Sequence, residues 1–306
     1  MPDLIVSFTK MEGAENDFIV IDNRFYHFSD TELQALARRW CPRRRGVGAD
    51  GVLALNPPDE DTSHEETSRG EAERSASASP VPDFRMRYVN ADGSMATMCG
   101  NGARCLARFA AEAGLGETES NSSRLTFDTD AGRYTADVPQ DADAPVRLWV
   151  PEPTRYRPSL SLAPETKHGF DWHQIWSGTE HIVAFADSED ALNEAPLETL
   201  APPLRHADAF APEGTNVNLT AVLDNHTARM RTYEKGVEGE TAACGTGVLA
   251  VAAVALRQER LAPPITIHTS GGTFRAGPAP EADAPAPWHL DGPARLVYQG
   301  TLEWTP

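Results

Sequence analysis

The sequence predicts an α+β fold made of two similar halves, each of which presents one cysteine at the start of a helix. Short strand-like runs alternate with a few helices along the 306 residues. A Cys-Gly-x-Gly core occurs twice, as MCGNG at residues 98–102 and as ACGTG at residues 243–247, and the two cysteines are 145 positions apart, about half the chain. Each copy follows a polar, glycine-bearing stretch and opens an alanine-rich helix. A match that includes these flanks and the half-chain spacing indicates two related halves.

The predicted strands are short runs that are rich in β-branched and aromatic residues and bounded by turn-forming residues. In chain order they cover residues 4–8, 18–22, 51–55, 84–89, 125–128, 147–150, 181–185, 218–222, 230–233, 265–268 and 294–298. Ser29, with Glu32 three positions later, resembles a capping box and predicts a helix that runs to about Trp40.

Two further helices follow the repeated cysteines. The helix after Cys99 is expected to end at Gly114 and the helix after Cys244 near Pro263, because glycine and proline both terminate helices. Residues 248–256 form an uninterrupted apolar run that occupies nearly all faces of the second helix. This pattern predicts a helix surrounded by sheet rather than one that lies on the surface.

Composition and charge exclude several classes of function. With 27 Lys plus Arg against 45 Asp plus Glu, the formal net charge is −18. A chain this acidic is repelled by phosphate backbones and anionic lipid surfaces, so no nucleic-acid or membrane partner is expected. The longest apolar run is far too short to span a membrane, and the N-terminus lacks a basic region followed by a long apolar stretch. The sequence therefore predicts a cytoplasmic protein.

Two segments differ from their surroundings. Residues 56–82 hold seven acidic residues against two arginines and no aromatic residue. Such a stretch cannot bury enough apolar area to offset its ordering entropy, so we expect a disordered acidic insertion. Residues 277–287 are rich in proline and alanine and predict an exposed turn region.

The four cysteines, at positions 41, 99, 105 and 244, form no CxxC pair and no His/Cys cluster with zinc-site spacing. This argues against a metal site, a redox pair and a disulfide framework. A single cysteine before a glycine-rich helix start is most often a small buried hydrophobe. The matching context of Cys99 and Cys244 favours reactive thiols for this pair, whereas Cys41 and Cys105 are expected to be structural.

Two thiols at helix starts suit proton transfer at a carbon next to a carboxylate. The unpaired N–H groups and the dipole at a helix N-terminus lower a thiol pKa, and the flanking glycines let an anion approach the backbone. If the two turns face each other across a cleft, one thiolate removes a proton from the carbon while the opposite thiol delivers one to the other face. That reaction is a racemisation or epimerisation, and it requires no cofactor.

At the level of motifs, the chain resembles the diaminopimelate epimerase family over nearly its whole length except the insertion. The motifs are KMEGAENDFIVID near the N-terminus, RGVGADG at 45–51, NADGSMATMCGNGARC, SGTEHIV at 177–183, GTNVNL at 214–219 and RTYEKGVEGETAACGTG. The resemblance implies a cofactor-independent enzyme that interconverts LL- and meso-2,6-diaminopimelate, with Cys99 and Cys244 as the acid/base pair.

The resemblance also implies roles for further residues. Those that assist the thiols are His181 and Glu234, and those that hold the substrate are Asn16, Asn90, Gly100, Asn101, Thr179, Asn216, Lys235, Gly245 and Thr246. Lys235 stands where the family often has an arginine that contacts the distal carboxylate. A lysine keeps the charge but cannot form the planar, bidentate pair of hydrogen bonds that an arginine forms with a carboxylate. Thr179 stands where many members have an asparagine, and Glu180 replaces a common proline. Without the resemblance, Asn16 and Asn90 would be read as turn residues and His181 as a satisfied buried histidine.

The fold that follows is two pseudo-symmetric halves, each a mostly antiparallel sheet wrapped around a central helix, with the active site in the cleft between them. The resemblance suggests that the last strand returns to the first half. We therefore expect a first half of residues 1–150 plus 294–306 that carries Cys99, and a second half of residues 151–293 that carries Cys244. A homodimer is compatible with the sequence.

Three other functions remain open at this point. A related two-cysteine amino-acid racemase, such as a histidine racemase, is kept open by the changes at Thr179 and Lys235. A cysteine hydrolase or acyltransferase would need only one of the two thiols with a histidine partner. A non-enzymatic amino-acid-binding module would show no turnover at all.

Overall fold

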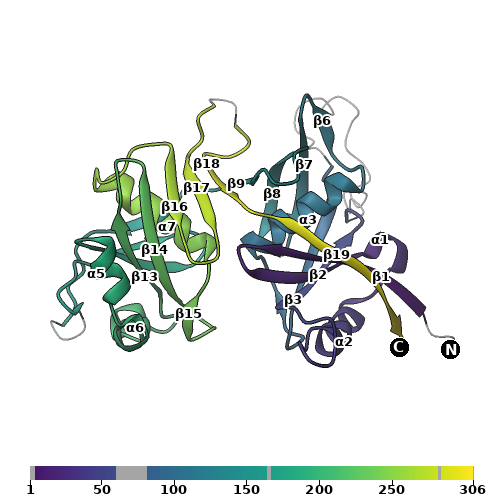
Figure 1. The fold of residues 1–306 in the computed structure, drawn as a ribbon, viewed down its shortest axis with the longest axis horizontal. Helices are drawn as coiled ribbons and strands as arrows, with labels where there is room; N and C mark the ends of the chain where they lie inside the picture. Colours follow the sequence, from purple (N-terminus) through teal and green to yellow (C-terminus); the bar gives the residue numbers. More distant parts are fainter. Residues whose placement is uncertain (1–3, 60–80, 164–166, 282–283, 306) are drawn as a thin grey trace, which may run out of the picture.

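The computed structural model describes residues 4–59, 81–163, 167–281 and 284–305, and it consists of two lobes of strands and helices (Figure 1). A mostly antiparallel sheet surrounds one central helix in each lobe, α3 (Gly100–Glu112) in the first and α7 (Gly245–Arg257) in the second. The predicted α+β fold of two pseudo-symmetric halves is confirmed. Among the described residues, no helix is long and apolar enough to cross a membrane.

The sheet of the first lobe contains two parallel junctions. β2 runs parallel to β3, and β4 runs parallel to β7, while the other neighbouring strands are antiparallel. In spatial order its strands are β19 (Arg295–Trp304), β1 (Leu4–Gly13), β2 (Asn16–Asp22), β3 (Gly51–Asn56), β4 (Phe84–Asn90), β7 (Ser122–Thr129), β8 (Gly132–Pro139) and β9 (Val146–Val150). The short strands β5 (Met95–Ala96) and β6 (Glu117–Glu119) pair with β4 and β7.

The sheet of the second lobe repeats this order. Its strands are β10 (Thr154–Arg157), β11 (His173–Trp176), β12 (Glu180–Ala186), β13 (Asn216–Val222), β14 (Thr227–Glu234), β16 (Ile265–His268), β17 (Thr273–Pro278) and β18 (Trp288–Gly292), with the short β15 (Gly239–Thr241) beside β14. The parallel junctions, β12 with β13 and β14 with β16, occur at the same places as in the first lobe. This shared pattern is the pseudo-symmetry of the fold.

Two strand pairings tie the lobes together. β9 of the first lobe pairs antiparallel with its counterpart β18, so one continuous sheet passes from one lobe into the other. The last strand, β19, pairs along its length with β1 and so returns the end of the chain to the first lobe.

The central helix α7 is buried because its sequence is apolar on nearly every face. Every residue of α7 from Gly247 to Ala255 is buried, in agreement with the prediction of a helix surrounded by sheet. α7 ends at Arg257, six residues before the predicted end near Pro263. The reason is local: Glu259 adopts a φ of 54°, in the left-handed region, and the N–H of Arg260 turns back to the carbonyl of Ala255.

The peripheral helices cover the outer faces of the two sheets. α2 (Asp30–Trp40) begins at the predicted capping box, in which the Ser29 hydroxyl and the Glu32 carboxylate each accept a bond from the other's backbone N–H. The second lobe has α5 (Glu189–Glu194) and α6 (Leu197–Arg205) on its sheet, and short turns of helix occur at α1 (Asn23–Tyr26) and at the 3-10 segment Asp208–Phe210.

The two atypical segments are only partly described. Residue 56 ends β3, and residues 60–80 of the expected insertion lie outside the described residues. The expected turn region at 277–287 is shorter than predicted, because Gly277 and Pro278 belong to β17, where Gly277 pairs with His289 of β18.

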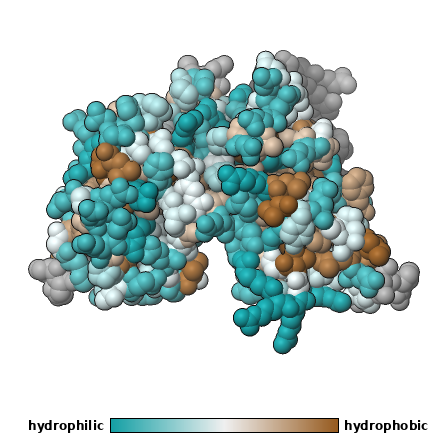
Figure 2. Space-filling view, viewed as in Figure 1, coloured by the Kyte–Doolittle hydropathy of each residue, from teal (hydrophilic) through white to brown (hydrophobic). Residues whose placement is uncertain are grey.

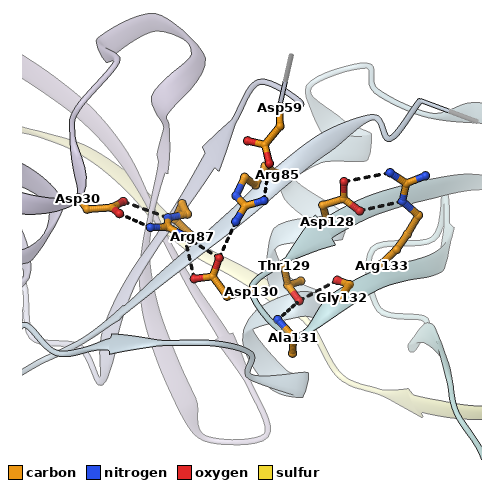
Figure 3. A network of polar contacts seen from close by, with 10 residues as sticks. All are labelled: Asp30, Asp59, Arg85, Arg87, Asp128, Thr129, Asp130, Ala131, Gly132 and Arg133. Atoms are coloured by element: carbon orange, nitrogen blue, oxygen red, sulfur yellow. Dashed lines mark hydrogen bonds and ion pairs between the residues drawn. The ribbon is translucent and has the colours of Figure 1, made fainter. Parts of the chain in front are cut away.

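Arginines on β4 connect the sheet to neighbouring segments of the first lobe (Figure 3). Arg87 binds Asp130 in the β7–β8 turn at 2.7 Å and also binds Asp30 at the start of α2. Arg85 binds the same Asp130 at 2.5 Å and Asp59 at 2.5 Å. The Arg85 bond holds Asp59, a residue of the acidic insertion, against β4.

Candidate active site

A cavity of about 950 Å³ lies between the two lobes and opens to solvent, where the space-filling view shows a notch between them (Figure 2). Both CGxG turns contribute to its wall, together with side chains from β4, β11, β14 and β18. The two helix starts approach each other closely, since a Cβ added to Gly245 would lie 4.0 Å from Asn101 Oδ1. The wall of the cavity is therefore built from both lobes around two opposed helix N-termini.

Each predicted catalytic cysteine is the residue that caps one central helix. Cys99 precedes α3 in an extended conformation, and its sulfur accepts the Gly102 N–H at 3.4 Å. Cys244 precedes α7 in a similar extended conformation. Both residues line the cavity, whereas Cys41 and Cys105 are buried in the hydrophobic cores. The fold thus presents the two thiols to one space.

The pKa values of both thiols are raised, whereas their positions at helix starts predicted lowered values. Burial raises the pKa of Cys99, against the opposing effect of the N–H groups of Gly102 and Asn101 and of the Arg104 charge. Burial also raises the pKa of Cys244 to about 12, and the Glu234 carboxylate adds to the rise. Loss of hydration therefore outweighs the effect of the helix ends, and both thiols are protonated at neutral pH.

On the Cys99 side, an oriented amide lies beside the thiol. Asn16 Oδ1 lies 3.6 Å from Cys99 Sγ and 3.4 Å from Asn101 Nδ2. Asn16 Nδ2 donates to Asp50 Oδ2 at 2.8 Å, and Arg43 binds Asp50 and so holds the carboxylate. Because the carboxylate only accepts, it fixes the amide with its oxygen toward the thiol. Sequence reasoning missed Asp50, although it lies within the RGVGADG motif.

A buried arginine lies behind the first helix start and was also missed. Arg104 is fully buried, with Nη2 donating to Asn101 Oδ1 at 2.6 Å and the guanidinium 5.2 Å from the centre of the Phe274 ring. Its Nη1 has no hydrogen-bond partner among the described residues. Burial lowers the pKa of Arg104, and its charge in turn lowers that of Cys99. The sequence signal for it was that the predicted helix carries two arginines, Arg104 and Arg108, among apolar residues.

On the Cys244 side, a hydroxyl stands between the thiol and a histidine. Thr246 Oγ1 lies 3.4 Å from Cys244 Sγ and 3.0 Å from His181 Nε2. His181 is fully buried and does not line the cavity, so it reaches the thiol only through Thr246. Burial lowers the pKa of His181 to about 3, which keeps the imidazole neutral.

Three more of the predicted substrate-site or catalytic residues lie on the wall. Glu234 accepts a hydrogen bond from the Thr241 hydroxyl at 2.9 Å, and burial raises its pKa. Asn90 donates to the Ser94 hydroxyl at 3.0 Å, and Thr179 donates to Glu180 at 3.2 Å. Gly100, Asn101, Gly245 and Thr246 line the cavity as well.

Asn216 and Lys235 lie behind the wall rather than on it. Asn216 Nδ2 donates to the carbonyl of Glu180 at 2.8 Å, and its Oδ1 accepts the Lys235 N–H at 2.8 Å. Lys235 Nζ binds the Glu180 carboxylate at 2.9 Å, so its charge is already paired. The described residues that line the cavity include no lysine or arginine. An anion in this cavity therefore depends on the helix ends for its binding.

Comparison with known sequences gives one family. A family profile described as Diaminopimelate epimerase matches residues 8–150 and 174–281. A diaminopimelate epimerase of Chlorobaculum tepidum is 35% identical over 294 residues, which cover 95% of this chain and 99% of that protein. One of Methanocella arvoryzae is 33% identical over 305 residues and covers 97% of each chain.

Solved structures with a similar fold have much lower sequence identity. A phenazine biosynthesis protein of the PhzF family from Bacillus anthracis superimposes with a TM-score of 0.68 at 14% identity, covering 98% of this chain and 99% of that one. A hydroxyproline epimerase from Agrobacterium vitis superimposes with a TM-score of 0.60 at 15% identity, covering 98% and 92%. At this identity the likeness concerns the fold alone.

Proposed function

The chain belongs to the diaminopimelate epimerase family, and on that premise we propose that Cys99 and Cys244 carry out the interconversion of LL- and meso-2,6-diaminopimelate by opposed proton transfers. The observation that supports this mechanism is that two thiols, each capping the N-terminus of a central helix, line one cavity between the lobes. The enzyme is an isomerase, and its substrate is a small molecule.

The geometry supports a two-base reaction. The N–H groups at the two helix starts bind the reacting carboxylate, and they stabilise the charge that develops on it as the α-proton leaves. One sulfur, as thiolate, removes that proton while the opposite thiol protonates the other face, so the configuration at carbon is inverted. Each turnover leaves the two sulfurs ready for the reverse reaction.

Both thiols have raised pKa values, so one must be ionised on the way to reaction. Glu234 is the acidic wall residue whose own pKa is raised by burial, which suits it to exchange a proton within the site. Asn90 and Thr179, which line the cavity, would then hold the distal end of the substrate, and Asn216 would support the wall behind them through its bonds to Glu180 and Lys235. Asn16, with its amide oxygen toward Cys99, would hold the reacting end.

We propose the two lobes as the units that move when the site closes. The first consists of residues 1–150 and 294–306 and the second of residues 151–293. Two strand pairings support this division. The pairing of β19 with β1 attaches the end of the chain to the first lobe, and the pairing of β9 with β18 is the boundary at which the sheets of the two lobes join. Closure would exclude water from the carbanion.

The proposed setting is the cytoplasm, because the reaction needs reduced thiols and all four cysteines are free in the structure. A homodimer is the proposed assembly. Exposed apolar side chains on the paired strands β1 and β19, among them Ile5 and Val297, support it. Sedimentation equilibrium on the full chain tests the assembly.

The activity is tested by incubating the purified chain with LL-diaminopimelate in deuterated water. Deuterium should enter the α-position as meso product forms, and Cys99→Ser and Cys244→Ser should each reduce epimerisation severely. If only one substitution mattered, a one-thiol hydrolase or acyltransferase mechanism would replace this one. Absence of deuterium exchange in the native protein would overturn the assigned substrate.

One observation favours a related amino-acid racemase as the second candidate. The Lys235 charge is paired with Glu180, and no cation lines the described part of the cavity wall, so a distal carboxylate has no free cationic partner there. The same deuterium assay with a panel of amino acids, histidine included, separates the candidates. Faster exchange into an amino acid other than diaminopimelate would favour the racemase.

A further inference from the structure

The two lobes place different side chains behind their two thiols. The strand registers of the lobes match, with pairs Phe18–Gly51 and Leu53–Tyr88 in the first and His181–Asn216 and Asn218–Thr232 in the second. Gly102 and Gly247, which occupy equivalent positions in the two CGxG turns, lie against residues at equivalent positions of the two sheets. A Cβ added to Gly102 would lie 3.0 Å from Leu53, and one added to Gly247 would lie 2.6 Å from Asn218 Oδ1. An apolar residue behind Cys99 is therefore replaced by an asparagine behind Cys244.

Asn218 is held in one orientation by groups that are all buried. Its Nδ2 donates to the carbonyl of Ile182 at 2.9 Å and lies 3.0 Å from His181 Nδ1, while the Thr232 hydroxyl lies 3.0 Å from its Oδ1. A carbonyl can only accept, so the amide nitrogen must face Ile182. Asn218 therefore has one remaining N–H, and that N–H points at His181 Nδ1.

This contact determines which ring nitrogen of His181 carries the proton. Nδ1 accepts from Asn218, so in the neutral ring the proton is on Nε2, which donates to Thr246 Oγ1 at 3.0 Å. The hydroxyl proton of Thr246 is then free to be donated to Cys244 Sγ, 3.4 Å away. Burial keeps the ring neutral, and of the nearby charges Lys235 and Glu180 act on it in opposite directions.

We propose that Asn218 is a positioning residue: it fixes the Nε2–H form of His181, and so makes Thr246 a hydrogen-bond donor to the Cys244 thiolate. Cys99 has the opposite neighbour, because the Asn16 oxygen can only accept from its thiol. The side chains that hydrogen-bond the two sulfurs thus differ: Thr246 is a donor to the Cys244 thiolate, whereas Asn16 is an acceptor for the Cys99 thiol, whose sulfur receives its donated bond from the Gly102 backbone. The catalytic consequence of this difference rests on the proposed function, whereas the hydrogen-bond chain itself does not.

The first test measures the reactivity of both cysteines in one sample. Alkylation rates with iodoacetamide are followed at Cys99 and Cys244 by peptide mass spectrometry between pH 7 and pH 10. Asn218→Leu, which installs the residue of the first lobe, should slow alkylation of Cys244 about tenfold at a given pH, because a bond that favours the thiolate is lost. The rate at Cys99 should stay the same.

Matched variants separate this role from a general loss of structure. Thr246→Val should slow alkylation of Cys244 as much as Asn218→Leu does, and Thr246→Ser should keep most of the native alkylation rate. Thr232→Val leaves both N–H contacts of Asn218 in place and should leave both rates within twofold of the native values. Equal slowing at both cysteines, or slowing by Thr246→Val without slowing by Asn218→Leu, would overturn the assignment to Asn218.

A second measurement needs no substitution and no substrate. Nitrogen-15 chemical shifts of the histidine rings in the native protein distinguish the two neutral forms, and His181 is expected in the Nε2–H form from pH 5 to pH 9. Observation of the Nδ1–H form would overturn the proposal even if the leucine variant did not fold. Because neither readout uses diaminopimelate, a failed epimerase assay would leave both results interpretable.

Discussion

At the scale of single residues, Arg104 is the least expected feature of the site. A fully buried guanidinium normally has an anionic partner, because burial of an unpaired charge is costly. Here it binds an amide oxygen, a more distant backbone carbonyl and an aromatic face. The residue 145 positions later, Leu249, carries no charge. The first lobe therefore supports its thiol with a positive charge, and the second lobe supports its thiol with a neutral hydrogen-bond chain.

Removing the Arg104 charge should affect one thiol only. Arg104→Met keeps an aliphatic side chain of similar length but removes the charge that lowers the Cys99 pKa, so alkylation of Cys99 should slow about tenfold at a given pH. Cys244 in the same sample is the control and should keep its rate. Unchanged reactivity of Cys99 in a folded variant would contradict the role of the charge.

His181 makes the stability of the protein depend on pH in the mildly acidic range. Its pKa is about 3 in the folded protein against 6.5 for the free group. The unfolded chain therefore binds more protons below pH 6.5, and stability is lost as the pH falls. One such group accounts for a loss of about 2 kcal/mol between pH 7.5 and pH 5.

The measurement compares urea unfolding of the native protein and of His181→Asn at the two pH values. The native protein should lose about 2 kcal/mol more than the variant on going to pH 5, whatever the stability of the variant at pH 7.5. An identical loss in the two proteins would mean that His181 is not held neutral in the folded state.

At the scale of elements, α2 shows how a local signal fixes a helix start. The Ser29–Glu32 capping box satisfies two N–H groups that no helix carbonyl can reach, and the buried Leu33, Leu36 and Trp40 attach the helix to the sheet. The element lies away from the cavity, since none of its residues line it.

Ser29→Ala should therefore lower the free energy of unfolding by about 1 kcal/mol and leave epimerisation unchanged. Thr31→Ala is the matched control, because it removes a hydroxyl from the same first turn without affecting the box. Urea unfolding and a standard activity assay measure the two effects. A loss of activity in Ser29→Ala would show that α2 is coupled to the site.

The elements that the sequence predicts are those with local signals. The capping box of α2, the two cysteine-capped helices and strands such as β16 follow from residues that are close in the chain. β8, β10, β11, β17 and β18 were missed, as were the short β5, β6 and β15; β18, for example, contains no β-branched residue. The C-terminal end of α7 was predicted too late in the chain, because the residue whose left-handed conformation ends the helix, Glu259, is neither glycine nor proline.

The candidate site residues also divide into those that a local sequence pattern predicts and those that depend on the packing of distant segments. The CGxG repeat and the motifs around it predicted the cavity-lining cysteines and turns from the sequence. The bond from Asn218 to His181 depends on the register of two parallel strands that are far apart in the chain, and no local pattern encodes a register. Arg104 was hidden for a similar reason, because only the packed lobe shows that its charge is buried.

At the scale of the whole molecule, the chemistry requires both lobes in one arrangement. The lobes share a sheet through β9 and β18, and each supplies one thiol to the same cavity. A disulfide forms only when the two Cα atoms come within about 7 Å, so crosslinking of Cys99 to Cys244 reports directly on how closely the helix starts approach.

We expect mild oxidation with diamide to join Cys99 to Cys244, with diamide reduced as the two thiols lose their protons and electrons. The linked peptides should appear in non-reduced digests, and activity should fall with linkage and return with dithiothreitol. Cys41 and Cys105 are internal controls, because both are buried away from the cavity wall and should remain free. Linkage that involved Cys105, or inactivation without a Cys99–Cys244 peptide, would mean that the two thiols do not face one another when the lobes close.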